Sequence, residues 1–356
     1  MIFYLITPLI LIIGSSLGLL ISPSWSISPF IWVFILVPII DIMLPYLNKK
    51  DQELNENLLH NFSIIIILPC ILFLIIFGLV VVSDISISVF AVAALGAAVG
   101  MSGGSIGITT AHELIHRQSY FMRSLGVILL ILCLYGHFRI EHVYGHHKDV
   151  CLKKDSATAQ RGQSIYHFII SSSLGQFITA YKIEIRRNKP IYQNRLLQST
   201  IRSVIFIFIM FMIGGVYGLV IALAIALVAK ILLETVNYIE HYGLVRKEGQ
   251  RVYPRHSWNS NHLMSNIMLY NLSRHSHHHE KAYLEFWELK PYDDAPEMPY
   301  GYLSMIYIAL LFPWWYHRIM AKKLIDWDAC YANDDEKEIA RQDNQNSGLK
   351  VLAGGS

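Results

Sequence analysis

Residues 110–117 read Thr110-Ala111-His112-Glu113-Leu114-Ile115-His116-Arg117. Histidines four positions apart lie one above the other on one face of a helix, so this stretch predicts a helix that presents two imidazoles to one site. Imidazole is the commonest metal ligand among protein side chains. The same H-E-x-x-H string binds zinc in metalloproteases, with the glutamate as base, so taken alone it leaves an intramembrane zinc protease open.

Two further histidine clusters follow at helical spacing. One reads Glu141-His142-Val143-Tyr144-Gly145-His146-His147, the other reads His275-Ser276-His277-His278-His279, and a single histidine ends the string 237–241. A catalytic zinc takes only three protein ligands, so this many imidazoles favours a pair of metals over a protease. An all-nitrogen set favours iron, copper or zinc over magnesium or calcium. The predicted ligands are His112, His116, His142, His146, His147, His241, His275, His278 and His279.

Five polar neighbours of these histidines are predicted to orient them. Side chains that follow one another along a helix point in different directions, so none of the three glutamates is an obvious direct ligand, and His277 lies about 100° off the face of its neighbours. A hydrogen bond to the second nitrogen of an imidazole is the role that fits them better. They are Glu113, Glu141, Glu240, Asn237 and His277. Histidines without a partner at ligand spacing are expected to be structural: His137, His167, His256, His262 and His317.

The composition is that of a membrane protein. Of 356 residues, 54% are hydrophobic and only 15% are charged, whereas a soluble domain has about a quarter charged. The net charge of +3 is too small to indicate nucleic-acid binding. None of the four cysteines forms a C-x-x-C pair, so no zinc ribbon or rubredoxin-type iron site is expected on this chain, and electrons must come from another protein.

The apolar runs predict six membrane spans in three hairpins. A span needs about 20 apolar residues. The runs are 2–21, 28–46, 62–83, 86–110 and 201–241, and Gly214-Gly215 divides the last of them into two. Residues 2–21 lack the basic start and the cleavage site of a signal peptide, so we expect a retained first span.

The run 121–138 is almost long enough to cross, but the histidines argue against it. If it crossed, the clusters before and after it would lie on opposite membrane faces and could not share a metal, so we expect a re-entrant or interfacial helix. The chain then divides into four spans (1–110), the first two histidine clusters (111–200), two spans (201–241), a cap with the third cluster (242–328) and a mobile polar tail (329–356).

Charge placement predicts the orientation. The loops assigned to the outside are 22–27, 84–85 and 214–217, and their single charged residue is Asp84. The other side carries many basic residues, Lys49 and Lys50 among them. Lys and Arg favour the cytoplasmic face, so the histidines and both termini are expected in the cytoplasm. One basic cluster, made of Lys182, Arg186, Arg187 and Lys189, is a candidate dock for an acidic electron donor, although the positive-inside bias explains it equally well.

Glycines recur every four residues in the fourth span, at Gly96, Gly100 and Gly104. Close packing of helices through small residues explains such a stripe. A second interpretation is that Gly100 and Gly104 form the smooth wall of a substrate channel.

With these strings in view, the chain resembles the integral-membrane alkane 1-monooxygenases. The resemblance rests on residues 110–117, 136–147, 237–244 and 272–279, with 155–158, 256–262 and 299–302 between or after them. It implies a non-haem diiron site, held by the nine histidines named above, that uses O₂ to hydroxylate a terminal C–H bond. It also implies a rubredoxin-type donor with an NAD(P)H-dependent reductase, no haem or flavin on the chain, and a multi-pass place in the bacterial inner membrane.

The resemblance has one departure and several rivals. The alkane enzymes commonly carry Asp where this chain has His277, and Gln where it has Ser273. These positions leave a xylene or toluene methyl hydroxylase open, and more distantly an acyl-chain desaturase. A non-enzyme alternative is a membrane protein that only handles metal, but transport predicts ionisable groups at mid-membrane depth rather than at one face.

Overall fold

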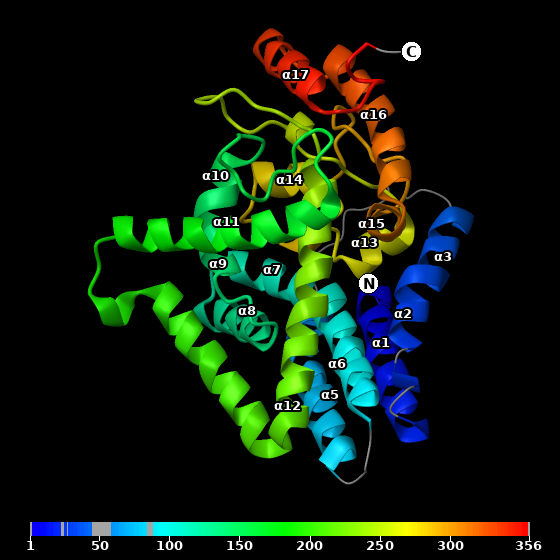
Figure 1. Ribbon diagram of the computed structural model, residues 1–356, viewed down its shortest axis with the longest axis vertical. Coiled ribbons are helices and arrows are strands. Elements are labelled where there is room, and N and C mark those ends of the chain that lie inside the picture. Colours follow the sequence, from blue (N-terminus) through cyan, green and yellow to red (C-terminus); the bar gives the residue numbers. More distant parts are fainter. Residues whose placement is uncertain (1, 23–24, 27, 45–57, 84–87, 355–356) are drawn as a thin grey trace.

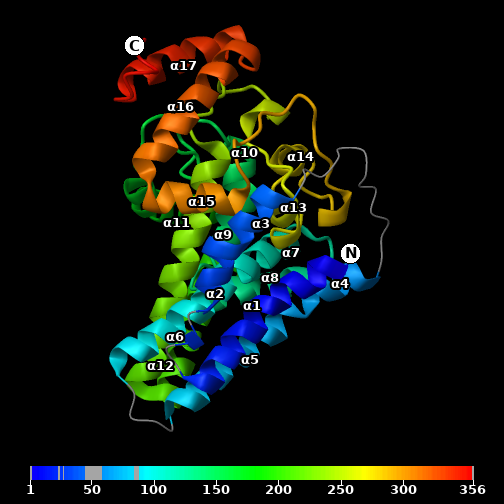
Figure 2. The same ribbon diagram turned by 90° about the vertical axis from the view of Figure 1, so that its right-hand side faces the viewer.

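The computed structural model describes residues 2–22, 25–26, 28–44, 58–83 and 88–354. Within these ranges the chain is helical, and its one β-type contact is an isolated bridge between Asn259 and Glu297. Figures 1 and 2 show long helices at one end of an elongated molecule and shorter helices gathered as a cap at the other. The basic and acidic residues Lys49, Lys50 and Asp84, used above to predict orientation, lie outside the described residues.

The first half of the chain forms a bundle of apolar helices. Its elements are α1 (Ile2–Ile21), α2 (Ser28–Ile31), η2 (Trp32–Leu36), α3 (Val37–Met43), α4 (Leu58–Ile65), α5 (Ile67–Ser83), α6 (Val89–Ser102), η3 (Gly103–Gly107) and α7 (Ile108–His116). In the described part of the chain, the helices long and apolar enough to cross a membrane are Phe3–Ile21, Leu58–Ser83, Val89–His116 and Arg195–His241. The apolar helix Ser28–Met43 is shorter than these.

The longest helix, α12 (Arg195–His241), turns back on itself. At Gly215 the backbone has φ 56° and ψ −139°, which is not helical and which a residue with a Cβ rarely adopts. Figure 1 shows the result as a V whose two arms meet at the end of the molecule farthest from the cap. The break therefore lies at the glycine pair that divides 201–241 in the sequence.

Helix α8 (Tyr120–Leu132) contains 13 residues. At 1.5 Å per residue it is about 20 Å long, short of the roughly 30 Å of a bilayer core. It packs against α7 and α12. It leads to α9 (Phe138–Glu141), η4 (His142–His146) and α10 (His147–Asp149), so the chain returns to the end of α7 with the second histidine cluster.

The remaining elements follow residue 164, and most of them form the cap. They are α11 (Ile165–Arg186), η5 (Ile191–Gln193), η6 (Pro254–His256), α13 (Leu263–Met268), α14 (His275–Glu280), η7 (Phe286–Glu288), α15 (Tyr302–Leu311), α16 (Pro313–Cys330) and α17 (Asp334–Asn346). Asp41, in α3, joins the bundle to the cap because its carboxylate accepts hydrogen bonds from the main-chain N–H of Met264 (2.8 Å) and the hydroxyl of Ser265 (2.6 Å).

The expectation of a mobile tail at 329–356 differs from the structure. Asn333 caps α17, whose Glu336 is fully buried. The Glu336 carboxylate accepts hydrogen bonds from Arg255 (2.8 and 3.1 Å) and His256 (2.8 Å). A buried carboxylate with two partners fixes the helix to the cap, and its polar sequence reflects an exposed outer face rather than disorder.

The glycine stripe packs α6 against the second arm of α12. A Cβ on Gly96 would lie 2.7 Å from the Cβ of Ala224, and one on Gly100 would lie 2.9 Å from the Cα of Ile225. A Cβ on Gly104 would lie 2.8 Å from the Cα of Ala229. Close helix packing is therefore the first role of the stripe, and it holds η3 and α7 in place beside α12.

Candidate metal centre

The nine histidines predicted as ligands form two compact groups. We call them the five-histidine group (His112, His116, His142, His147 and His278) and the four-histidine group (His146, His241, His275 and His279). Within each group, one ring nitrogen of every member lies within 4.8 Å of those of all the others. Their grouping, with adjacent His146 and His147 in different groups, follows from the tertiary fold.

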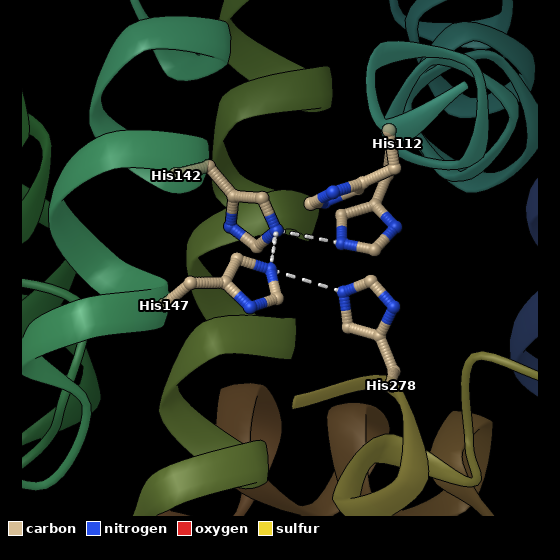
Figure 3. Close-up of side chains that lie close together, drawn as sticks. His112, His142, His147 and His278 are labelled. Carbon is tan, nitrogen blue, oxygen red and sulfur yellow. Dashed lines mark hydrogen bonds between the residues drawn. The ribbon is translucent and has the colours of Figure 1, made fainter. Parts of the chain in front are cut away.

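In the five-histidine group the Nε2 atoms converge. The Nε2 of His142 lies 2.8 Å from that of His112 and 3.0 Å from that of His147, which in turn lies 3.1 Å from that of His278. Figure 3 shows these rings pointing at one another from η4–α10, α7 and α14. Three separate segments thus deliver their imidazoles to one point.

The four-histidine group has the same character. The Nε2 of His275 lies 3.1 Å from that of His241 and 3.0 Å from that of His279. His146 joins them, with its ring centre 4.9 Å from that of His241 and 4.9 Å from that of His279. Here α12 and α14 face the end of η4.

A π-helical turn explains how one segment serves both groups. In an α-helix His142 would share a face with His146, but η4 widens the turn over His142–His146. A wider turn brings position i+5 under position i, so His147 joins His142 while His146 faces the other group. Single π-turns of this kind are frequent at functional sites.

The donor atoms fit bound metal. Burial lowers the pKa of His275, His278 and His279, and neighbouring imidazoles lower it further, so these rings are neutral at pH 7 and offer a lone pair. A neutral imidazole carries one N–H, so converging nitrogens cannot all hydrogen-bond to each other. Nitrogens bound at right angles to a metal at about 2.1 Å lie about 3 Å apart, close to the spacings above.

Two of the predicted ligands are oriented by groups that sequence reasoning missed. His146 donates through Nδ1 to the buried carboxylate of Asp155 (2.9 Å), which is itself held by the hydroxyl of Thr158 (2.6 Å). His241 donates through Nδ1 to the main-chain oxygen of His256 (2.9 Å). Each bond leaves Nε2 facing the group, as supports of metal ligands do. Asp155 belongs to the string 155–158, which contributes to the family resemblance. Its separation of nine residues from His146 gave no indication of the hydrogen bond between them.

The five predicted orienting residues have different surroundings. The Oε2 of Glu240 lies 3.3 Å from the Nε2 of His275. Glu113 pairs with Arg117 (2.8 Å) and accepts from the N–H of Phe286, and His277 accepts through Nδ1 from the N–H of Lys290 (2.8 Å). These two therefore contact other parts of the cap rather than an imidazole of either group.

The remaining two of the five are buried. Glu141 is buried with its Oε2 unpartnered in the described structure, and Asn237 donates to Glu234 (3.4 Å). Their orienting role stays a prediction.

A narrow apolar hollow of about 30 Å³ lies against the five-histidine group. His112 and His142 line it together with aliphatic and aromatic side chains, and Asn237 and Glu240 add a polar edge. The lining residues are Gly104, Ile108, Thr109, His112, Phe138, His142, Leu233, Val236, Asn237, Glu240, Leu269 and Leu272. Gly104 thus contributes to the hollow as well as to helix packing, whereas Gly100 is not among its lining residues.

The two groups differ in access to solvent. All members of the four-histidine group are buried, whereas His116 and His147 of the five-histidine group are partly exposed. Any small molecule or electron donor that arrives from solvent therefore meets the five-histidine group first.

Fold and site together describe a helical protein with several apolar helices long enough to cross a membrane and two histidine groups that could each hold a metal ion. The chain belongs to the fatty acid desaturase family, whose sequence model matches residues 88–309. Within that family it is homologous to the alkane 1-monooxygenases. It is 38% identical to alkane 1-monooxygenase 1 of Pseudomonas aeruginosa over 67% of this chain and 64% of that protein.

Two further relatives are an alkane enzyme from another organism and a hydroxylase of another substrate class. Alkane 1-monooxygenase 1 of Alcanivorax borkumensis is 34% identical over 82% of this chain and 76% of its own length. The xylene/toluene monooxygenase hydroxylase component of Pseudomonas putida is 33% identical over 68% of this chain and 67% of its own. The match covers 64% and 60% of the two Pseudomonas aeruginosa alkane 1-monooxygenases, so it spans under two thirds of each.

Proposed function

We propose that this protein is a membrane-bound, non-haem diiron monooxygenase that converts an alkane into a 1-alkanol. The observation that carries the proposal is an apolar hollow that is lined by His112 and His142, two members of the five-histidine group. The four-histidine group lies beside that group. The balanced reaction takes the hydrocarbon, O₂, two electrons and two protons, and gives the alcohol and water. One C–H bond and the O–O bond break, while a C–O bond and new O–H bonds form.

Each histidine group would hold one iron, and the pair of irons would supply the oxidant that an unactivated C–H bond requires. The protein contributes position and environment. Phe138, Leu233 and Leu269 give the hollow an apolar wall that accepts a methyl end and excludes water. Asp155 and the main-chain oxygen of His256 keep His146 and His241 in the tautomer that presents Nε2.

Electrons would come from a rubredoxin-type protein served by an NAD(P)H-dependent reductase, and no haem or flavin is proposed on this chain. We place the protein in the bacterial inner membrane, with six spans, and with the histidines and both termini on the cytoplasmic side. Helix α8 would be re-entrant or interfacial, since its 13 residues are too few to cross.

Methyl hydroxylation of xylene or toluene is the second candidate, because a hydroxylase component of that class is among the relatives. His277 is one position at which the resemblance to alkane enzymes departs, yet its ring lies against Tyr292 (centres 5.0 Å apart), outside both histidine groups. That placement favours the alkane reading. Acyl-chain desaturation is the more distant alternative.

The test is a product assay by gas chromatography and mass spectrometry. Membranes holding the protein receive a rubredoxin donor system, O₂ and an equimolar mixture of octane, hexadecane and p-xylene. We expect a 1-alkanol as the main product. A methylbenzyl alcohol in its place would move the protein to the second candidate.

Two variants control the assay. His112→Ala removes a member of the five-histidine group and should abolish product, whereas His167→Ala changes an exposed histidine outside both groups and should leave turnover intact. Absence of any oxygenated product while two irons are bound per chain would refute the hydroxylase proposal.

A further inference from the structure

Beside the five-histidine group lies a polar cleft of about 370 Å³ that the proposed reaction does not use. It opens between the end of α7, the start of α8 and the segment α9–η4, and we call it the arginine cleft. Its polar lining consists of His116, Arg117, Gln118, Arg123, Arg139 and Tyr144. No carboxylate lines it in the part of the chain that the structure describes.

Two of the three guanidinium groups lack an anionic partner. Arg117 is neutralised by Glu113 (2.8 Å) and by Glu285. Among the described residues, Arg123 donates only to the main-chain oxygens of Arg117 (2.8 Å) and Gln118 (2.5 Å). Arg139 has no hydrogen bond and no ion pair with any described residue. The cleft therefore carries about two uncompensated positive charges.

Arg139 is also poorly solvated. Its side chain is only partly exposed, and burial lowers its pKa, with further lowering by nearby Arg195 and Arg123. A partly buried cation among other cations is costly unless an anion joins it. Arg195 cannot share that anion easily, because it is committed to Glu184 (2.7 Å) and lies over the ring of Tyr144 (4.4 Å). An external anion would satisfy Arg139 and Arg123 together.

The surroundings of the cleft indicate where this anion comes from. At the start of α8, next to Arg123, Tyr120 and Phe121 are 80% and 59% exposed. Exposed aromatic residues beside basic ones are typical of the headgroup level of a membrane. Helix α11, which packs on α9, carries an exposed apolar stripe of Tyr166, Ile170, Leu174, Ile178, Tyr181 and Ile185. Figure 1 shows α8 and α9 framed by α11 and the first arm of α12.

We propose that the arginine cleft binds the phosphate of an anionic phospholipid whose acyl chains begin beside the exposed Tyr120 and Phe121 at the start of α8. Guanidinium groups bind phosphate oxygens in pairs, with a directional, charge-assisted geometry that a lysine lacks. The bound headgroup links the end of α7 to α9–η4. These segments carry His112 and His116 on one side and His142 and His147 on the other, so the lipid braces the five-histidine group.

The test compares vesicles of pure phosphatidylcholine with vesicles that also contain phosphatidylglycerol. The readouts are thermal unfolding in the vesicles and phosphatidylglycerol retained in native mass spectra. We expect the wild-type protein to melt at a higher temperature with phosphatidylglycerol and to retain it. The double variant Arg123→Gln/Arg139→Gln should weaken retention by about tenfold or more and lose the stabilisation. The double variant Arg318→Gln/Lys322→Gln makes the same charge change at exposed positions of α16 and should retain phosphatidylglycerol and its stabilisation as the wild type does.

A single substitution distinguishes loss of lipid binding from misfolding of the double variant. Arg139→Gln breaks no bond within the described protein, so it should fold and still lose lipid retention, whereas Arg139→Lys should keep part of it. Equal lipid retention by Arg139→Gln and wild type would overturn the proposal. Stabilisation by inorganic phosphate in pure phosphatidylcholine would assign the site to free phosphate and overturn the lipid source. If Arg139→Gln retained lipid as the wild type does but had a raised KM for the acidic electron donor, the lipid proposal would be overturned and the cleft would be assigned to donor docking.

Discussion

At the scale of single residues, Asp155 is the side chain whose replacement is most informative. In Asp155→Asn the carboxylate that accepts from His146 Nδ1 becomes a neutral amide, which weakens the hold on the ring and its basicity. Loss of such a support typically costs about 10- to 100-fold in metal affinity. We expect the variant to bind less metal at the four-histidine group and to keep the five-histidine group filled. Metal per chain after graded chelator treatment, followed by elemental analysis, measures this.

The matched control is Asp149→Asn, which changes a carboxylate that pairs with Lys154 (3.3 Å) and touches neither group. It should retain the wild-type metal content. If Asp155→Asn bound metal as tightly as the wild type, Asp155 would not support His146 in the way the hydrogen bond indicates.

The pairing of histidines within each cluster was predictable from sequence because helical spacing is local. Spacing of four places His112 above His116 whatever the rest of the chain does. The assignment of His146 and His147 to different groups was not predictable, because it depends on the π-turn η4 and on where α14 docks. Asp155 was missed for a related reason: it reaches His146 through a loop, and loops have no periodicity to read.

At the scale of elements, the contact between α6 and α12 sets the position of α7. We expect Gly100→Ala to lower the free energy of unfolding by about 1–3 kcal/mol, because its Cβ would meet the main chain of Ile225 at 2.9 Å. Gly103→Ala is the control, since a Cβ there meets only the sulfur of Cys133 at 3.5 Å, an ordinary contact. Thermal unfolding in detergent compares the two, and equal melting temperatures would refute the packing role.

Helix α17 is a second element with a measurable dependence on pH. Burial alone would raise the pKa of Glu336, but hydrogen bonds from His256 and Arg255 outweigh it and hold the pKa at about 2. Because the pKa in the folded state lies below that of an unfolded glutamate, about 4.5, the carboxylate stabilises the cap fully above pH 5. That contribution, roughly 1–3 kcal/mol, is lost as the pH falls from about 5 towards 2.

Glu336→Gln separates this effect from general acid unfolding. The variant should be less stable at neutral pH and should lose less stability on acidification, with faster hydrogen exchange in α17. The same acid sensitivity in the variant and the wild type would show that Glu336 does not hold the helix. His256 links this element to the site, since its ring donates to Glu336 while its main-chain oxygen accepts from His241.

At the scale of the whole molecule, the orientation in the membrane can be tested with one cysteine. Cys330, at the end of α16, is exposed, whereas Cys133 and Cys151 are buried and Cys70 is partly buried. With the cap in the cytoplasm, a membrane-impermeant maleimide should label Cys330 in inverted vesicles and leave it unlabelled in intact spheroplasts. Cys330→Ser should abolish the label, and labelling in spheroplasts would reverse the proposed orientation.

The helical fold was predictable from the long apolar runs in the sequence. A chain segment inside a bilayer must satisfy its own main-chain hydrogen bonds, and a helix does this within one segment. The turn in α12 was also predictable from the sequence, since a residue with a Cβ rarely adopts the combination of φ 56° and ψ −139° found at Gly215. The docking of α17 was not predictable from the sequence, because the partners of Glu336, Arg255 and His256, lie some eighty residues earlier and no local pattern indicates the pairing.

The division of histidines between the groups also orders events during synthesis. Four of five members of the five-histidine group precede residue 148, before the chain of α12 has been made. The four-histidine group has only His146 by then and gains its other members after α12 is complete. One histidine group therefore has most of its members while the ribosome is still translating, and the other gains most of its members only after the last long helix has been made. Neither group is complete before α14 is made, because His278 belongs to the five-histidine group and His275 and His279 to the four-histidine group, so one short helix completes both groups late in synthesis.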